Sequence, residues 1–306
     1  MEILSVHSHK GGAGKTTLTL LLAKAYARAR RKVCAVDLDF IGSGFEYGVR
    51  VHRKGGRFLD EYILRDAMSP DMPKLDELIS EYRDDDLGNG KIDMVFNHGA
   101  DVAGLGTRTE LRKNVGQLAG LEPGAGVVGG ALRLLLESFE EQGYDVVLLD
   151  CHPGLAHVSI SVLRLFKDPA FSSRSTSLFL ATPDRPHIFG MLEELNFLRS
   201  SDGDELFDPQ RAILVVNRGE KPPLLSLAQV QQEITRDDLM PEAGTWWSHL
   251  DLVHYCRILE RPELREISRI GGPGIIPVPP SNVIKCDDTP LCRKVFAQLG
   301  EPFHVR

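Results

Sequence analysis

The stretch His9-Lys10-Gly11-Gly12-Ala13-Gly14-Lys15-Thr16-Thr17 is separated only by His7 and Ser8 from the apolar run Ile3-Leu4-Ser5-Val6, and it opens a segment with helical periodicity. A short strand, a glycine-rich turn and Lys-Thr at the start of a helix are typical of a phosphate-binding loop. Glycines allow main-chain N–H groups to turn toward an anion, because no Cβ blocks the approach. The following helix adds the positive end of its dipole. The stretch therefore predicts a phosphate site at residues 11–17.

Two side chains of this loop have expected roles. Lys15 is expected to reach the β- and γ-phosphates of a nucleotide, and the Thr16 hydroxyl is expected to bind Mg²⁺. The other nucleotide-binding residues expected in the loop are Gly11, Gly12, Ala13, Gly14 and Thr17. The signature G-x-x-x-x-G-K-[ST] is not fully met, because its first glycine falls on His9, and an additional lysine, Lys10, precedes the glycines.

The pattern K-G-G-x-G-K-T-T, with Lys10 in addition to Lys15, resembles the deviant Walker A motif of the ParA/MinD family of ATPases, which are P-loop proteins of the SIMIBI class. The resemblance implies Mg²⁺-dependent binding of ATP, slow hydrolysis to ADP and an ATP-controlled homodimer. In that family the lysine that corresponds to Lys10 reaches the nucleotide of the other subunit. The resemblance therefore implies catalytic roles for both lysines, and also a protein partner that stimulates hydrolysis.

A pair of aspartates follows the second predicted strand, residues 33–37, whose continuous apolar character is typical of a strand buried on both faces. The stretch Asp37-Leu38-Asp39-Phe40-Ile41-Gly42 lies at the carboxyl end of that strand, where open α/β sheets bind their ligands. It resembles the switch I segment of the family. This resemblance implies that Asp39 holds the attacking water and that Asp37 supports the Mg²⁺ environment. Two turn-forming aspartates are the alternative interpretation.

A third motif is the apolar run that ends in Asp150, which is typical of a Walker B strand. Its carboxylate is expected to complete Mg²⁺ binding, usually through water. The segment Cys151-His152-Pro153-Gly154 resembles the family's switch II, with His152 in place of the first proline, and this implies a main-chain contact of Gly154 with the γ-phosphate. Cys151, His152 and His157 as zinc ligands form a weaker alternative, because three clustered groups lack a second pair.

The asparagine that ends the run at residues 212–218 is a candidate for base recognition. Asn217 matches the family's asparagine that reads the adenine edge, and an amide supplies one acceptor and two donors for such an edge. A turn-forming asparagine is the alternative. Residues 274–280 resemble the family's last strand and base-contacting turn, but the acidic residue of that turn is absent.

Strand-like runs alternate with helical runs, which predicts an α/β fold with a doubly wound, mostly parallel sheet flanked by helices. The expected strands cover residues 3–6, 33–37, 91–96, 144–150, 177–184, 212–218 and 274–280. The expected helices cover residues 18–29, 57–68, 74–82, 131–142, 188–198, 224–234 and 289–299. The resemblance implies that residues 1–306 form a single P-loop ATPase domain, with a Gly-rich segment at residues 97–130 to which no regular structure is assigned.

The composition narrows the function classes. The net charge of −7, from 36 basic and 43 acidic residues, does not indicate binding of duplex DNA through bulk charge. Five scattered cysteines do not form a disulfide framework, and they favour a cytoplasmic location; Cys286 and Cys292 are interpreted as free thiols. No signal peptide or membrane-spanning segment is expected. The basic stretch at residues 293–296 is too short to predict a membrane anchor.

The cellular role has three candidate interpretations. The first is a ParA/MinD-like positioning, partition or regulatory switch, for which neither a DNA nor a membrane surface is supported by the sequence. The second is an ATPase for maturation of a metallocluster or cofactor, using the cysteines. The third is a phosphotransferase of the same fold that acts on a small molecule, with residues 97–130 as a lid.

Overall fold

The computed structural model describes residues 1–40, 45, 49, 56–64, 74–83, 87, 90–97, 125–182, 185–200, 206–219, 254–259, 284–286 and 289–296. Its strands are β1 (Glu2–Ser8), β2 (Val33–Leu38), β3 (Ile79–Tyr82), β4 (Ile92–Val95), β5 (Val146–Cys151), β6 (Ser175–Ala181), β7 (Ala212–Gly219), β8 (His254–Leu259) and β9 (Ile284–Cys286). Its helices are α1 (Lys15–Arg28), α3 (Leu59–Leu64), α4 (Leu75–Leu78), α6 (Ala125–Glu141), α7 (His157–Lys167), α8 (Arg185–Ser200) and α12 (Pro290–Phe296), with the 3-10 turns η2 (Ser172–Arg174) and η3 (Pro209–Arg211).

The described strands form one sheet in the order β3-β4-β2-β5-β1-β6-β7-β8-β9. The strands from β4 to β8 in this order are parallel, whereas β3 pairs antiparallel with β4 and β9 pairs antiparallel with β8. Strand β1 lies between β5 and β6, and its carboxyl end leads into α1. The predicted doubly wound, mostly parallel α/β sheet is confirmed.

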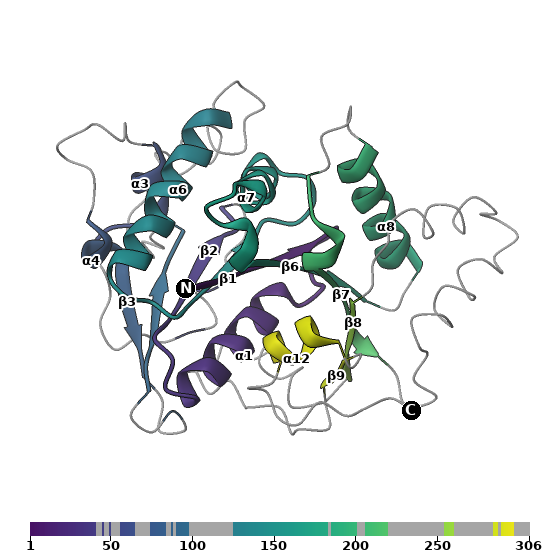
Figure 1. Cartoon of the computed structure of the whole chain (residues 1–306), viewed down its shortest axis with the longest axis horizontal. Helices are drawn as coiled ribbons and strands as arrows, with labels where there is room; N and C mark the ends of the chain where they lie inside the picture. Colours follow the sequence, from purple (N-terminus) through teal and green to yellow (C-terminus); the bar gives the residue numbers. More distant parts are fainter. Residues whose placement is uncertain are drawn as a thin grey trace, which may run out of the picture.

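Helices cover both faces of the sheet (Figure 1). Helices α1 and α12 lie on one face, and α3, α4, α6, α7 and α8 lie on the other. Alternate side chains of β1 point to opposite faces of the sheet. Leu4 and Val6 belong to the apolar cluster with α1, whereas Ile3 belongs to the cluster with α6 and α7. Because the central strands are buried on both faces, their sequences are almost continuously apolar.

The predicted helix at residues 74–82 is wrong in its second half. Helix α4 ends at Leu78, and residues Ile79–Tyr82 form β3, which pairs with β4. Ile79 and Tyr82 are both buried in this strand. Branched and aromatic residues suit a pleated surface, and the pairing with β4 outweighs the local helical periodicity.

Three further differences concern the extent of elements. Helix α6 begins at Ala125 rather than at residue 131, and strands β8 and β9 were not expected from the sequence. The predictions for Gly42, for 98–124 of the Gly-rich segment, for the helix at 224–234 and for the strand at 274–280 lie outside the described residues. Within the described part of the chain, none of the helices combines the length and the apolar character needed to cross a membrane.

Candidate nucleotide-binding site

The glycine-rich loop connects β1 to α1 at the carboxyl edge of the sheet, as the sequence predicts. Gly12 (φ 83°) and Gly14 (φ 97°) adopt left-handed backbone conformations, in which other residues are strained. Gly14 is also the residue that caps the amino end of α1. A Cβ added at Gly11 or Gly12 would meet no atom within 4 Å, so the loop has an open side on which a ligand can approach the main chain.

A lysine, a threonine and an aspartate meet where α1 begins. Lys15 is only 6% exposed, and the Thr16 Oγ1 donates a hydrogen bond of 2.6 Å to Asp150 Oδ2. Asp150 Oδ1 is buried and accepts no hydrogen bond from any described residue. A buried carboxylate oxygen without a donor is costly unless it meets a cation. Oxygen atoms of this kind are the ligands that Mg²⁺ prefers, so Thr16 and Asp150 fit a magnesium site.

Two buried carboxylates lie side by side, because Asp37 of β2 is in register with Asp150 of β5. Burial, and then the neighbouring Asp150, raise the pKa of Asp37 well above its usual value. Burial raises the pKa of Asp150 to about 7, although the nearby Lys15 charge and the Thr16 hydroxyl act in the opposite direction. This concentration of negative charge at the loop favours bound cations.

Asp37 also holds the chain that follows β2. Its Oδ1 accepts from the Asp39 main-chain N–H at 3.0 Å, and its Oδ2 accepts from the Phe45 N–H at 3.3 Å. The Asp39 carbonyl in turn accepts from Asn97 Nδ2. The Asp39 carboxylate is half-buried, with Oδ1 3.7 Å from His152 Nε2. The structure therefore brings the predicted switch I and switch II residues together.

The predicted switch II glycine is tied to β1. Gly154 has φ 74°, and its N–H donates to the Ser8 carbonyl at 2.7 Å. A contact of this N–H with a phosphate would require exchange of that bond. The next helix is attached to the same loop, because Ser159 Oγ of α7 donates to the His152 carbonyl at 2.9 Å.

The other two predicted residues of interest flank the loop. Asn217, in β7, donates from Nδ2 to the Ala13 carbonyl at 2.7 Å and lies against Gly14. Lys10 has an exposed side chain, while its carbonyl accepts from Ser8 Oγ at 2.8 Å. Asn217 thus supports the loop directly, and Lys10 is accessible to a second molecule.

His9 makes a contact that the sequence did not predict. Its Nδ1 lies 3.0 Å from Glu194 Oε2 of α8, and Glu194 is 8% exposed. The imidazole packs on Gly190, one helical turn earlier, where an added Cβ would lie 2.9 Å from His9 Cγ and closer still to other ring atoms. His9, which stands where the strict loop signature has its first glycine, is therefore held against α8 by Gly190 and Glu194.

We predict that Gly190→Ala lowers the free energy of unfolding by about 1–3 kcal/mol, because the new Cβ overlaps the His9 ring. Denaturant unfolding measures the change. The double variant His9→Gly/Gly190→Ala should recover most of this loss. As a matched control, Gly129→Ala in α6 meets no atom within 4 Å and should be neutral or stabilising. Equal effects of both alanines would contradict the proposed packing of His9.

The zinc alternative at Cys151, His152 and His157 receives no support from the geometry. Cys151 is buried in β5, with Sγ 3.8 Å from His7 Nε2, whereas His152 turns toward Pro153 and Asp39. In the described ranges no three His, Cys, Asp or Glu side chains are grouped so that they could hold a metal ion. Burial and the Lys15 charge lower the pKa of His7 to about 3, so this imidazole is neutral.

A glycine loop between a central strand and a helix, with a Thr-Asp pair beside a buried lysine, defines a P-loop nucleotide-binding protein. Residues 4–102 match the sequence profile of the CobQ/CobB/MinD/ParA nucleotide-binding domain. This match confirms the resemblance to the ParA/MinD family over these residues. No curated protein sequence matches the chain.

Solved structures of McdA and MinD proteins share the fold. McdA from Cyanothece, an aspartate-to-alanine variant in complex with ATP, has a TM-score of 0.61 at 16% identity, over 100% of this chain and 99% of that chain. MinD from Aquifex aeolicus has a TM-score of 0.55 at 14% identity, over 100% of both chains. The MinC:MinD complex from the same organism gives 0.54 at 16% identity, over 100% and 99%. At these identities the likeness establishes the P-loop fold alone.

Proposed function

We propose that the protein binds Mg²⁺–ATP and hydrolyses it slowly, and that ATP joins two copies into a dimer that acts as a positioning, partition or regulatory switch. The observation that carries the proposal is the buried Asp150 oxygen without a donor, beside the Thr16 hydroxyl at the start of α1. Such an oxygen at a glycine-rich loop is what a nucleotide-bound Mg²⁺ requires.

The phosphates are held by main-chain N–H groups of residues 11–17 and by the Lys15 ammonium. Lys15 is nearly buried, so its charge is little screened by water and acts strongly on a phosphate. Asn217 packs against the loop through Ala13 and is placed to contribute to the nucleotide pocket. Its role in reading the base is part of this proposal.

Thr16 and Asp150 hold the Mg²⁺ of the nucleotide. Bound Mg²⁺ neutralises negative charge on the phosphate oxygens as it develops during the reaction. Asp37 contributes by holding the main chain beside the cation site, because its two oxygens accept from the N–H groups of Asp39 and Phe45.

Asp39 orients the attacking water and accepts its proton. Its main-chain N–H is fixed by Asp37 and its carbonyl by Asn97, so the backbone is held while the carboxylate remains partly accessible. Gly154 senses the γ-phosphate by exchanging its bond with the Ser8 carbonyl for a bond with the phosphate. Because α7 is bonded to the same loop through Ser159, this exchange moves a helix as well.

Lys10 acts on the nucleotide of the second subunit. Its side chain is exposed, whereas its carbonyl is held by Ser8, so the lysine is presented outward from a fixed backbone. The added positive charge in the dimer then stabilises the transition state in trans. The MinD of Aquifex aeolicus was crystallised with MinC, which supports a protein partner for this chain as well.

The proposal is tested by sizing the protein in solution with Mg²⁺–ADP and with a non-hydrolysable ATP analogue. We expect a monomer with ADP and a dimer with the analogue, with binding confirmed by calorimetry. If a well-folded protein gave no heat of binding when titrated with Mg²⁺–ATP, the whole proposal would be wrong. If the protein stayed monomeric with both nucleotides, the proposed ATP-controlled dimerisation would be wrong.

We predict that Lys10→Ala reduces steady-state ATP turnover by about 10- to 100-fold, the effect of losing one charge-assisted hydrogen bond. The affinity of the monomer for ADP should change by only about twofold, because the side chain is exposed. Turnover measured with and without equimolar Lys15→Ala protein, which supplies an intact Lys10, separates a trans from a cis role. Unchanged turnover in the Lys10→Ala variant alone would contradict the proposed catalytic role of Lys10.

A further inference from the structure

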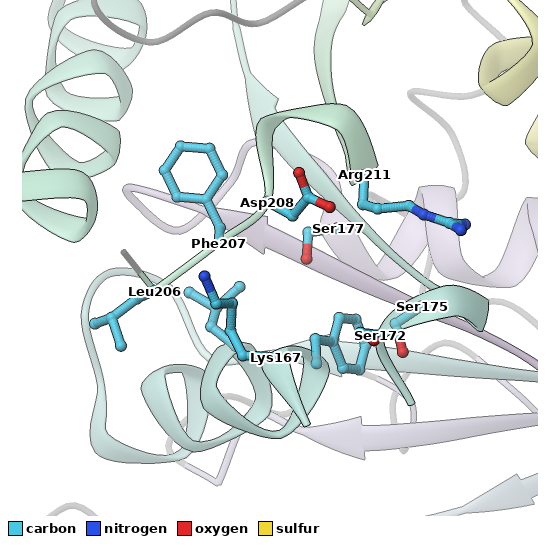
Figure 2. Close-up of a pocket in the computed structure, with 10 residues that line it drawn as sticks. Lys167, Ser172, Ser175, Ser177, Leu206, Phe207, Asp208 and Arg211 are labelled. Carbon is cyan, nitrogen blue, oxygen red and sulfur yellow. The ribbon is translucent and has the colours of Figure 1, made fainter. Parts of the chain in front are cut away.

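A second concave site lies away from the nucleotide loop, between α7, β6 and η3 (Figure 2). The cavity has a volume of about 160 Å³, and its apolar wall is formed by Leu163, Phe166, Leu206 and Phe207. It opens beside the amino ends of β6 and β7, whereas the glycine loop follows the carboxyl end of β1. None of its lining residues belongs to the nucleotide site described above.

Charged groups of both signs line the cavity. Lys167 at the end of α7 and Arg211 in η3 provide two cations, and Asp208 provides one anion. Asp208 Oδ1 accepts from the Gln210 N–H at 2.9 Å, which fixes the carboxylate. Figure 2 shows the Lys167 and Asp208 side chains reaching toward the same space from opposite walls. Within the described ranges, these three groups form no ion pair with each other or with other side chains.

A serine at the base of the cavity is available as a donor. Ser177 is 5% exposed, and its Oγ accepts a hydrogen bond of 3.3 Å from Ser5 Oγ. Its own proton can therefore be donated into the cavity that Ser177 lines.

The charge pattern selects the kind of ligand. Lys167 and Asp208 are exposed at the rim of the cavity, and a ligand that enters between them removes part of their water, which is unfavourable for a charge without a partner. A simple carboxylate would leave Asp208 facing another anion, and a simple amine would leave Lys167 unpaired. A zwitterion satisfies both groups, and its side chain can contact the apolar wall.

We propose that this cavity binds a free α-amino acid with an aliphatic or aromatic side chain, and that its occupancy is coupled to the nucleotide site. The carboxylate lies with Lys167 and the Ser177 hydroxyl, and the ammonium lies with Asp208, whereas the Arg211 side chain extends away from both charged groups (Figure 2). The small volume fits a single amino acid rather than a larger metabolite.

The coupling follows from two connections to the nucleotide site, and it rests on the proposed function. Helix α7 carries Leu163, Phe166 and Lys167 at the cavity, and its amino end is bonded to the switch II loop through Ser159. In addition, a buried polar chain runs from Ser177 to Ser5, then to His7 at 2.8 Å, then to Cys151, the residue after Asp150.

The first experiment measures binding to the nucleotide-free full chain by calorimetry, with leucine and phenylalanine as probes. Two analogues of leucine test the assignment of the charges: 4-methylpentanoate lacks the ammonium, and 3-methylbutylamine lacks the carboxylate. We expect saturable binding of at least one amino acid below about 10 mM and at least about tenfold weaker binding of both analogues. No saturation by either amino acid, or equal binding of the analogues, would overturn the proposal.

Variants locate the binding within the cavity. Lys167→Ala should weaken amino-acid binding by about tenfold or more, whereas Arg164→Ala, which removes a cation of the same helix that does not line the cavity, should not. Asp208→Asn keeps a side chain that can cap η3 but removes the charge, so it should reduce the preference for leucine over 4-methylpentanoate. If Lys167→Ala and Arg164→Ala changed the amino-acid affinity equally, the amino acid would not be bound in this cavity.

A second titration tests the coupling. The amino-acid affinity is measured again with a saturating non-hydrolysable ATP analogue and Mg²⁺, and we expect a change of about fivefold or more. An unchanged affinity would overturn the coupling but leave the amino-acid site. Amino-acid binding by a protein that binds no nucleotide at all would instead refute the proposed function and retain the site.

Discussion

Lys15→Ala is expected to weaken the binding of Mg²⁺–ATP and Mg²⁺–ADP by roughly 10²–10⁴-fold, which corresponds to the loss of two charge-assisted hydrogen bonds to phosphate. The size of the effect follows from burial, because the Lys15 side chain is only 6% exposed and its charge is poorly screened. The lysine is also the cation that counteracts the raised pKa of Asp150, so its removal makes that carboxylate harder to ionise. Calorimetry with each nucleotide measures the loss.

The chain offers a matched control for this prediction. Lys10→Ala removes a lysine of the same loop, but one whose side chain is exposed, and it should leave monomer affinity almost unchanged. Thermal unfolding of both variants checks that the sheet is intact. If both lysine variants lost affinity equally, general loop charge rather than direct phosphate contact would account for binding.

The core of the site could be predicted from short sequence patterns. Asp37 in β2 and Asp150 in β5 each lie at the end of an apolar run, and the loop glycines follow shortly after β1. The carboxyl ends of parallel strands meet at one edge of the sheet, so residues far apart in sequence converge there. The Thr16–Asp150 bond is the outcome of this convergence.

The contacts of His9 could not be predicted in the same way. They depend on Gly190 and Glu194, which both lie on α8. The position of α8 over the loop is set by its packing against β6. The only sequence signal was a glycine and an acid one turn apart within a predicted helix. That spacing is common and has no meaning until the partner of the helix is known.

Short edge strands and the second cavity escaped prediction for related reasons. β3 and β9 are short and gain their stability from pairing with β4 and β8, so their local sequences carry little signal. The cavity is built from the ends of α7, η2, β6 and η3, and none of these ends carries a recognisable motif alone.

Asp39→Ala is expected to reduce ATP hydrolysis by about 10²–10⁴-fold while ATP binding and the dimer persist. The variant removes only the carboxylate: the N–H that donates to Asp37 and the carbonyl that accepts from Asn97 belong to the main chain and are retained. Single-turnover hydrolysis, together with sizing in the presence of ATP, measures both parts of the prediction.

An alternative base is His152, whose Nε2 lies 3.7 Å from Asp39 Oδ1. His152→Ala keeps the Asp39 carboxylate and should therefore hydrolyse ATP within about tenfold of the unmodified protein, since it removes a neighbour rather than the proposed base. Slow hydrolysis in the Asp39 variant with near-normal hydrolysis in the His152 variant assigns proton acceptance to the carboxylate. The reverse pattern would assign it to the imidazole, and two slow variants would indicate that the Asp39–His152 pair acts as a unit.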